Sequence, residues 1–366
     1  KRHIALFLPA LNSGGAEYAF IRLANYLVRH GHQIDLLVVK REGALIDIID
    51  TDVKRVELGG KGMLRAFFPL LRYIRGHRPE WLIAALPGPN LIAIFAGLSA
   101  RLFMANRPGI AISQHHPFSE KARHATKLRS RIRHGLARFL YPFADRIIAV
   151  SHGVADDLAE RTRVERDKIT VIHNPFDIAA IQQKAKERTG HSWLETRDTP
   201  VILSAGRLEA PKDFATLIRA VAQFDDCRLI ILGEGPEHAS LEQLASEHGI
   251  KARVDFTGFV ANPYSYFARA DCFVLSSHYE GFGNVIVEAL ATGTPVIATD
   301  CPHGPREILD NEAYGRLVPP GDTGALAAAI DNTLNPQYAG NQQAGRERAQ
   351  AFDISTIAEY YLACFD

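Results

Sequence analysis

The chain has 366 residues, about twice the length of a typical domain, so its length favours two domains with a cleft between them. Hydrophobic residues make up 47% and charged residues 23%, and the net charge is +1, a balance that argues against a nucleic acid partner. The four cysteines lie far apart in apolar surroundings, which argues against a zinc site or a redox motif and predicts buried free thiols in a reducing compartment. No apolar run reaches the roughly 20 residues that cross a bilayer. The first predicted strand begins almost at residue 1, so we expect a cytoplasmic protein.

The first part of the chain alternates β-rich apolar runs with amphipathic stretches, which predicts a parallel sheet covered by helices. The predicted strands are residues 4–11, 34–39, 53–58, 81–86, 110–113, 147–150 and 169–172. A second series repeats the pattern, with predicted strands at residues 201–205, 229–232, 254–257, 273–275, 295–299 and 316–318. The sequence therefore predicts an α/β protein built from two Rossmann-like domains.

The segment between the two series predicts the domain boundary. Residues 175–200 are polar and rich in Lys, Glu and Thr, with little strand character, and we place the centre of the boundary near Arg188. The predicted domains are residues 1–180 and 181–350. The closing stretch looks helical and has no partner strand, so we expect residues 351–366 to form a helix that packs back on the first domain.

The turn after the predicted strand 273–275 carries the clearest chemical signal. Residues 280–288 read EGFGNVIVE, and a helix is predicted at 285–291. A glycine-bearing turn from a strand into a helix exposes backbone N–H groups at a positive helix terminus, which suits phosphate. Glu280 stands before the turn and Glu288 one turn into the helix, so one carboxylate can meet a sugar and the other a ribose diol. A capped, solvent-facing helix with incidental acids is the alternative.

Two basic residues follow the first strand of the second series. Arg207 stands directly after Gly206 at the end of the strand, and Lys212 follows five residues later at the start of the next predicted helix. Fixed positive charges at this place can grip a diphosphate and stabilise the charge that builds on the β-phosphate as a sugar leaves. A surface salt bridge is the alternative interpretation of this pair.

The run EGFGNVIVE and the motifs around it resemble the retaining GT-B glycosyltransferases of family 4. The similarity extends to GGAE at 14–17, AVS at 149–151, VIHNP at 171–175, GRL at 206–208, KDF at 212–214, GEGP at 233–236, ALA at 289–291, PVIA at 295–298 and GPREI at 304–308. Spaced motifs in the family's order argue against chance. The resemblance implies the GT-B fold, in which the parallel sheets of two Rossmann-like domains face a central cleft.

The resemblance also implies catalytic roles for four residues. Arg207 and Lys212 would clamp the leaving group, and Glu280 would orient the sugar hydroxyls. His115, which ends the predicted strand 110–113, would touch the donor sugar. His116 departs from the small acid or Asn that usually follows this histidine in the family, and a polar loop histidine is the alternative for His115.

A larger set of residues is implied to bind the donor. These are Gly14, Gly15, Gly206, Gly258, Phe259, Val260, Phe282, Gly283, Asn284, Val285 and Glu288. The loop with Gly14 and Gly15 would reach the phosphates and the acceptor, and residues 258–260 would use backbone groups against the base. In both loops, turn geometry alone explains the glycines equally well.

The mechanism follows mostly from the resemblance. Retaining family members keep the donor's anomeric configuration, and no Asp or Glu in this chain stands out as a nucleophile on the β face. A front-face route, in which the departing phosphate helps to deprotonate the acceptor, is consistent with the absence of such a nucleophile. We expect no cofactor and no metal, because Asp50 and Asp52, which match a D-x-D pattern, lie just before the predicted strand 53–58, at the wrong end for the cleft.

The expected substrates are a nucleotide-sugar donor, UDP-linked and carrying a hexose or N-acetylhexosamine, and a glycan or lipid-linked glycan acceptor of cell-surface polysaccharide or lipopolysaccharide synthesis. Between His115 and Pro142 there are seven Lys or Arg residues and one acid, Glu120, interleaved with apolar residues. A basic amphipathic helix of this kind suits an anionic membrane surface, and a solvated basic face is the alternative. We therefore expect a cytoplasmic protein that associates peripherally with the inner face of the cell membrane.

Two rival functions remain open at this point. A UDP-sugar epimerase or hydrolase on the same fold would bind the donor without an acceptor, and the basic helix and the two clamping cations argue against it. A non-catalytic sugar-nucleotide-binding subunit would have the fold without turnover. The presence of Arg207, Lys212, Glu280 and Glu288 argues against such a loss of catalytic activity.

Overall fold

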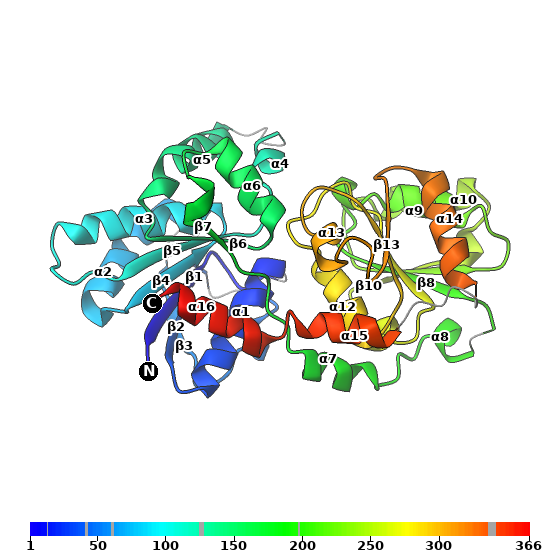
Figure 1. Ribbon diagram of the computed structural model, residues 1–366, viewed down its shortest axis with the longest axis horizontal. Helices are drawn as coiled ribbons and strands as arrows, with labels where there is room; N and C mark the ends of the chain where they lie inside the picture. Colours follow the sequence, from blue (N-terminus) through cyan, green and yellow to red (C-terminus); the bar gives the residue numbers. More distant parts are fainter. Residues whose placement is uncertain (13, 41–42, 60–61, 124–127, 197, 336–341) are drawn as a thin grey trace. The chain divides into compact units, whose positions relative to one another are not determined.

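The chain divides into two units, each with its own parallel sheet, in a computed structural model (Figure 1). The structure describes residues 1–12, 14–40, 43–59, 62–123, 128–196, 198–335 and 342–366. One unit is Lys1–Phe176 together with Ile354–Asp366, and the other is Asp177–Asp353.

The first unit has a 7-stranded parallel sheet in the order β3-β2-β1-β4-β5-β6-β7. Its strands are β1 (His3–Leu8), β2 (Gln33–Val38), β3 (Lys54–Glu57), β4 (Trp81–Ala85), β5 (Gly109–Gln114), β6 (Arg146–Ala149) and β7 (Ile169–Val171). Its helices are α1 (Gly15–Arg29), α2 (Phe67–His77), α3 (Pro87–Arg101), α4 (Phe118–Arg123), α5 (Leu128–Leu140), α6 (His152–Arg161) and α16 (Ile354–Cys364), with 3-10 turns η1 (Ile46–Ile48), η2 (Met63–Ala66), η3 (Tyr141–Phe143) and η4 (Arg166–Lys168). The strand order reverses between β1 and β4, as in a doubly wound sheet.

The core of the first unit lies under α1 and α16. Phe20 and Leu27 on α1 are buried, because apolar residues recur there at helical spacing. Tyr361 on α16 is buried in the same cluster. Beyond that helix, Phe365 stacks on Trp81 with ring centroids 4.7 Å apart. The last helix of the chain therefore completes the core that the first strands begin.

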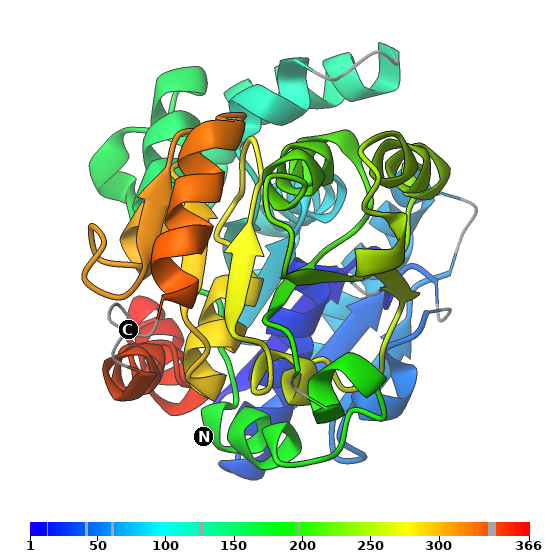
Figure 2. The same cartoon turned by 90° about the vertical axis from the view of Figure 1, so that its right-hand side faces the viewer.

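The second unit has a 6-stranded parallel sheet in the order β10-β9-β8-β11-β12-β13, which is the same doubly wound pattern (Figure 2). Its strands are β8 (Val201–Ala205), β9 (Arg228–Leu232), β10 (Val254–Gly258), β11 (Cys272–Leu275), β12 (Val296–Thr299) and β13 (Arg316–Val318). Its helices are α7 (Ile178–Ala185), α8 (Ser192–Thr196), α9 (Phe214–Val221), α10 (His238–Glu247), α11 (Tyr264–Phe267), α12 (Asn284–Thr292), α13 (Pro305–Ile308), α14 (Thr323–Leu334) and α15 (Gln342–Gln350), with 3-10 turns η5 (Ala210–Lys212) and η6 (Lys251–Arg253).

The chain passes between the units after Phe176, twelve residues before the predicted centre at Arg188. The helix α7 explains the difference, because it begins directly after the passage and belongs to the second unit. Asp177 caps this helix by accepting a hydrogen bond from the Ala180 N–H at 2.9 Å, and Ile181 is buried. The polar composition of residues 175–200 hid a short capped helix with a narrow apolar face.

The helix expected at residues 351–366 on the first domain is α16, and the closing stretch before it adds a second helix. The closing stretch thus forms α15 in the second unit and α16 in the first, separated by residues 351–353. Phe352, between them, is buried and meets Phe282 edge to face at 5.5 Å. The return to the first unit thus begins at Ile354, whose N–H donates to the Phe176 carbonyl at 2.7 Å.

All four cysteines are free thiols, as predicted. Cys227, Cys272 and Cys301 are buried, whereas Cys364 is only half-buried because it lies near the end of α16. Among the described residues, no helix combines the length and the hydrophobicity that crossing a membrane requires.

Candidate active site

The strand order locates the candidate site in the second unit. Open parallel sheets bind ligands beyond the carboxyl ends of their strands, at the point where the order reverses. In this sheet the reversal falls between β8 and β11. The loops that leave these two strands, residues 206–213 and 276–283, therefore form the expected site.

An ion pair joins these two loops. The Lys212 ammonium donates to Glu280 Oε1 at 2.5 Å, and the side chains are 27% and 12% exposed. Ser277 donates its hydroxyl to the same carboxylate oxygen at 2.7 Å. Ser276 donates to the Lys212 carbonyl oxygen at 2.8 Å. Two residues that lie 68 positions apart in the sequence are thereby held together at the switch point.

The local fold explains why Lys212 stands there. Asp213 adopts a left-handed conformation with φ 46° and caps α9, where its carboxylate accepts from the Thr216 N–H at 3.2 Å and hydroxyl at 2.6 Å. The preceding turn is tied to the other loop, because the His278 N–H donates to the Pro211 carbonyl at 2.8 Å. Lys212 is therefore presented from a capped turn fixed on both sides.

Arg207 occupies a more open position than Lys212. Its guanidinium Nη1 lies 3.0 Å from Glu209 Oε1, and its side chain is 64% exposed. The structure thus brings Lys212 to Glu280 but pairs Arg207 with an acid of its own loop. Arg207 therefore forms a surface salt bridge, which was the alternative interpretation of the two cations. The Lys212–Glu280 pair does not fit that alternative, because it is largely buried.

Glycines allow the loops after β8 and β9 to pack closely. The Leu208 N–H donates to the Glu234 carbonyl at 3.0 Å. Gly233 has φ 132°, and a Cβ there would collide with the carbonyl oxygen of Gly206. Glycine is required here for backbone contact as well as for the left-handed conformation. Gly206 therefore lies beside the Lys212 side chain, in a loop that is packed against the loop after β9.

The run 282–285 opens helix α12 beside the ion pair. Gly283 has φ 100° and caps the helix without a side-chain hydrogen bond. Asn284 and Val285 lie in its first turn, where backbone N–H groups and the helix dipole favour an anion. Phe282 is buried against Phe352, so its ring belongs to the core and its backbone alone can serve the site. Glu288, one turn later, is half-buried.

Gly304 closes this site from the loop after β12, and it supports a prediction on stability. Its φ is 108°, and a Cβ there would collide with the Phe282 carbonyl oxygen. We expect Gly304→Ala to lower the free energy of unfolding by about 2 kcal/mol or more, because strain and collision add. Urea denaturation measures the change.

The matched control for this prediction is Gly324→Ala in the first turn of α14. A Cβ at Gly324 meets no atom closer than 3.6 Å, and its φ lies outside the left-handed region. Alanine at that position should stabilise the protein slightly. Equal effects of the two substitutions would show that the 304 loop does not depend on its glycine.

The predicted base-binding loop lies at the edge strand β10. Gly258 has φ 78°, and its carbonyl accepts from the Gly233 N–H at 2.8 Å. Phe259 is 64% exposed, and Val260 is half-buried. The hydrogen bond joins this loop to the β9 loop, which in turn packs on the β8 loop that carries Arg207.

The buried thiol of Cys301 lies near the Lys212–Glu280 ion pair. Burial, followed by the nearby Glu280 carboxylate, raises the pKa of Cys301 to about 12. The thiol is therefore protonated at neutral pH and acts as an apolar neighbour.

In the first unit, the predicted residues lie at the carboxyl ends of β1 and β5. Gly14 caps α1, and its lack of a Cβ admits the buried Glu17 carboxylate, which folds back over the helix N-terminus. Gly15 begins the same helix. His115, directly after β5, is buried, with Nε2 3.0 Å from the Ser113 hydroxyl and its ring against Phe20 at 5.8 Å.

The D-x-D pattern has a structural explanation. Asp50 Oδ2 accepts from Arg29 Nε at 2.7 Å, and Asp50 Oδ1 accepts from the Asp52 N–H at 3.1 Å. These two hydrogen bonds, the backbone one first, lower the pKa of Asp50. The turn precedes β3, at the amino end of the sheet. Within the described residues, no group of three or more His, Cys, Asp and Glu side chains gathers as metal ligands would.

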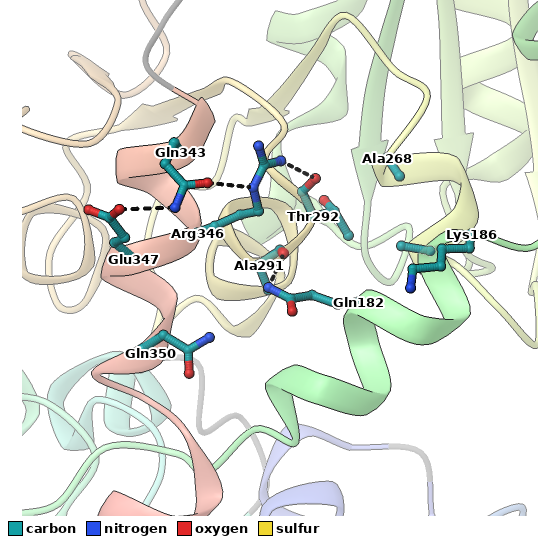
Figure 3. Close-up of a pocket in the computed structure, with 10 residues that line it drawn as sticks. Gln182, Lys186, Ala268, Ala291, Thr292, Gln343, Arg346, Glu347 and Gln350 are labelled. Atoms are coloured by element: carbon teal, nitrogen blue, oxygen red, sulfur yellow. Dashed lines mark hydrogen bonds between the residues drawn. The ribbon is translucent and has the colours of Figure 1, made fainter.

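A pocket lies at the carboxyl end of α12, the end away from the Lys212–Glu280 pair (Figure 3). It is about 600 Å³ in volume and lies between α7, α12 and α15. Arg346 Nη1 donates to the Thr292 carbonyl at 3.3 Å, which places a positive charge at the negative end of α12. This contact holds α15 on α12.

Sequence reasoning missed Ser276, Ser277 and Asp213. Each of them fixes Lys212 or Glu280 through a hydrogen bond or a helix cap. Their signal was present, because two serines directly follow a predicted strand at its carboxyl end. Polar residues at that position of a parallel sheet point toward the ligand site.

Two doubly wound parallel sheets, with a lysine–glutamate pair at the switch point of the second, define a two-domain α/β protein of the GT-B fold. A solved structure with this fold, Anabaena HepE in complex with UDP, has a TM-score of 0.82 and 22% identity over 99% of this chain and 98% of that chain. Two family models match, Glycosyltransferase Family 4 over residues 13–180 and Glycosyl transferases group 1 over residues 186–351. The chain therefore belongs to the group 1, family 4 glycosyltransferases.

Two curated relatives come from Campylobacter jejuni. The first is N-acetylgalactosamine-N,N'-diacetylbacillosaminyl-diphospho-undecaprenol 4-alpha-N-acetylgalactosaminyltransferase, with 35% identity over 61% of this chain and 60% of that protein. The second is GalNAc-alpha-(1->4)-GalNAc-alpha-(1->3)-diNAcBac-PP-undecaprenol alpha-1,4-N-acetyl-D-galactosaminyltransferase, with 26% identity over 98% of this chain and 97% of that protein. The first similarity thus spans less than two thirds of the relative, whereas the second spans almost all of it.

Proposed function

We propose that this protein transfers a hexose or N-acetylhexosamine from a UDP-sugar to a glycan or lipid-linked glycan acceptor, with retention of anomeric configuration. The observation that carries the proposal is the Lys212–Glu280 pair at the switch point, beside the N-terminus of α12. The pair places a cation that can bind phosphate next to a carboxylate that can bind sugar hydroxyls. Both Campylobacter relatives named above carry undecaprenol in their names, which supports a lipid-linked acceptor.

In the proposed reaction, the diphosphate lies against Lys212, Arg207 and the first turn of α12. As the bond from the anomeric carbon to the β-phosphate oxygen breaks, negative charge grows on that phosphate, and the two cations stabilise it. Glu280 orients the sugar hydroxyls. The departing phosphate accepts the proton of the acceptor hydroxyl on the same face of the sugar, and this oxygen forms the new bond to the anomeric carbon.

The other proposed contacts complete the donor site. Glu288 accepts from the ribose hydroxyls, and the backbone of residues 258–260 meets the base. Gly14, Gly15 and His115 are proposed to serve the phosphates, the acceptor and the donor sugar from the first unit. A lipid-linked acceptor would bring the protein to the inner face of the cell membrane.

The first test is thermal denaturation with UDP-, GDP- and ADP-sugars. A ligand that binds the native state at about 100 times its Kd stabilises it by about 2.7 kcal/mol, which raises the melting temperature by several degrees. We expect this rise with a UDP-sugar and its loss in Glu288→Ala. Glu247→Ala, on the exposed face of α10, is the matched control and should keep the rise.

The outcomes separate the rival functions. No shift with any nucleotide sugar would remove the proposal, and a shift without any turnover of the bound sugar would favour the non-catalytic sugar-nucleotide-binding subunit. A UDP-sugar that is bound and then hydrolysed or epimerised at the same rate with and without glycan acceptors would favour the hydrolase or epimerase. Transfer to an undecaprenol-linked glycan, with product stereochemistry read by NMR, tests both the acceptor and retention.

A further inference from the structure

The positive charge of the chain is concentrated in the first unit. Residues 59–144 contain 14 Lys and Arg residues but only two acidic residues, Glu80 and Glu120, in a chain whose net charge is +1. This stretch runs from the loop after β3 to the residue before Asp145. It includes α2, α3 and α5, and is much longer than the basic segment 115–142 that the sequence pattern singled out.

Helix α5 and the turn after it present apolar side chains to solvent. Ile132, Leu136, Phe139 and Phe143 are 53%, 42%, 50% and 52% exposed. Their spacing of four, three and four residues places them on one side of the helix. His134, Ala137 and Tyr141, on the other side, are buried. The helix thus has one apolar side in the core and a second one in solvent.

The neighbouring helices extend this exposed surface. Leu64 and Phe68, on η2 and α2, are 80% and 75% exposed. Leu102 and Phe103, after α3, are 78% and 68% exposed. Helix α3 contacts both α2 and α5, so these elements form one layer (Figure 1). The elements η2, α2 and α5 also carry exposed arginines, at positions Arg65, Arg72, Arg75, Arg131 and Arg138.

This basic apolar surface, formed by η2, α2, α3, α5 and η3, selects its partner by charge. Large exposed apolar patches mark interaction sites. A second copy of the same surface would oppose positive charge to positive charge, which disfavours a symmetric dimer. Anionic lipid head groups neutralise the arginines, whose long stems bury beside the inserted apolar side chains.

We propose that this surface docks the protein on a bilayer that contains anionic phospholipid. Leucine and phenylalanine side chains enter the boundary between head groups and acyl chains, and the arginines bind the head groups. The inference rests on the proposed function only for the membrane acceptor that makes docking useful. Vesicle binding needs no sugar transfer, so the two ideas can fail separately.

The experiment is cosedimentation with vesicles of phosphatidylcholine alone and with 30% phosphatidylglycerol added. We expect at least tenfold stronger binding to the anionic vesicles, weakened by salt, because each basic side chain near such a surface contributes about fivefold in affinity. Arg72→Glu with Arg75→Glu should lower this binding at least tenfold. Arg219→Glu with Lys251→Glu, two exposed basic residues of the second unit, is the matched charge control.

The apolar part is tested by Ile132→Glu with Leu136→Glu. The control is Ile48→Glu with Tyr360→Glu, which adds the same charge at side chains of the first unit that are 47% and 54% exposed. We expect the first double variant to lose vesicle binding at least tenfold and the control to keep most of it. All four double variants should keep the wild-type melting temperature and transfer to a soluble acceptor.

Three results would overturn the proposal. The wild type could bind neutral and anionic vesicles equally or not at all. The helix variants could bind like their controls. Light scattering could show a wild-type dimer that these variants dissociate, which would assign the surface to a second copy. Vesicle binding without any sugar transfer would instead remove the proposed function and leave this inference in place.

Discussion

Replacing Lys212 by alanine is expected to lower kcat for sugar transfer about 10³-fold, because one fixed charge on a developing oxyanion contributes on that order. The lysine is held 2.5 Å from Glu280 at the switch point of the second sheet, where a donor diphosphate would lie. The effect should appear in kcat more than in KM, since the charge on the β-phosphate grows as the bond breaks. Steady-state kinetics with a UDP-sugar and its acceptor measure both.

Two further variants test whether the loss of kcat in Lys212→Ala comes from the missing charge or from a change in structure. Lys212→Arg keeps the charge and should recover part of kcat, whereas Lys251→Ala removes an exposed lysine of the same unit and should leave kcat unchanged. Lys212→Ala also leaves the largely buried Glu280 without its cation, so the melting temperature has to be measured beside the rate. A folded Lys212→Ala variant with wild-type kcat would exclude the lysine from the clamp.

Arg207→Ala is the companion measurement in the same assay. We expect a smaller loss than at Lys212, because Arg207 is 64% exposed and already pairs with Glu209. Water and salt screen an exposed charge, so Arg207 should stabilise the developing charge on the phosphate less than the largely buried Lys212. Full turnover in Arg207→Ala would limit the clamp to Lys212.

The sequence predicted the sheets mainly through their central strands, which are buried on both faces. Val201–Ala205 is such a strand, and its run of apolar residues between turn signals is visible without a structure. Every predicted strand is present in the structure, with small shifts at the ends. The chain passes between the units after Phe176, four residues before the predicted boundary at residue 180, because α7 buries only a narrow face and helices of that length give a weak periodic signal.

The candidate site was predictable only as separate loops. Motifs placed Lys212 and Glu280 at the carboxyl ends of two strands, and the strand order made those ends neighbours. The sequence could not show that the two side chains neutralise each other, because that depends on rotamers and on loop closure. The same limit hid Ser277, whose hydroxyl bond to Glu280 depends on the turn between them.

Glu280→Gln is expected to change turnover and nucleotide affinity in opposite directions. In the donor-free protein, Glu280 neutralises the ammonium that the diphosphate is proposed to bind. The amide keeps the size and a hydrogen-bond acceptor for Ser277 but releases the positive charge of Lys212 and removes a negative charge near the phosphates. The ion pair has to be broken when the donor binds, so we expect UDP to bind about fivefold more tightly to the variant, which corresponds to about 1 kcal/mol. Calorimetric titration measures the affinity.

The same substitution should lower kcat about 10²-fold, because the sugar hydroxyls lose the carboxylate that orients them. Glu247→Gln, on the exposed face of α10, is the matched control and should change neither quantity. If UDP bound more weakly to Glu280→Gln, the carboxylate would be a support for the loop and not a competitor of the diphosphate. Tighter UDP binding with impaired turnover would mean that donor binding replaces an internal ion pair, so that one carboxylate first orients the phosphate-binding lysine and then the sugar.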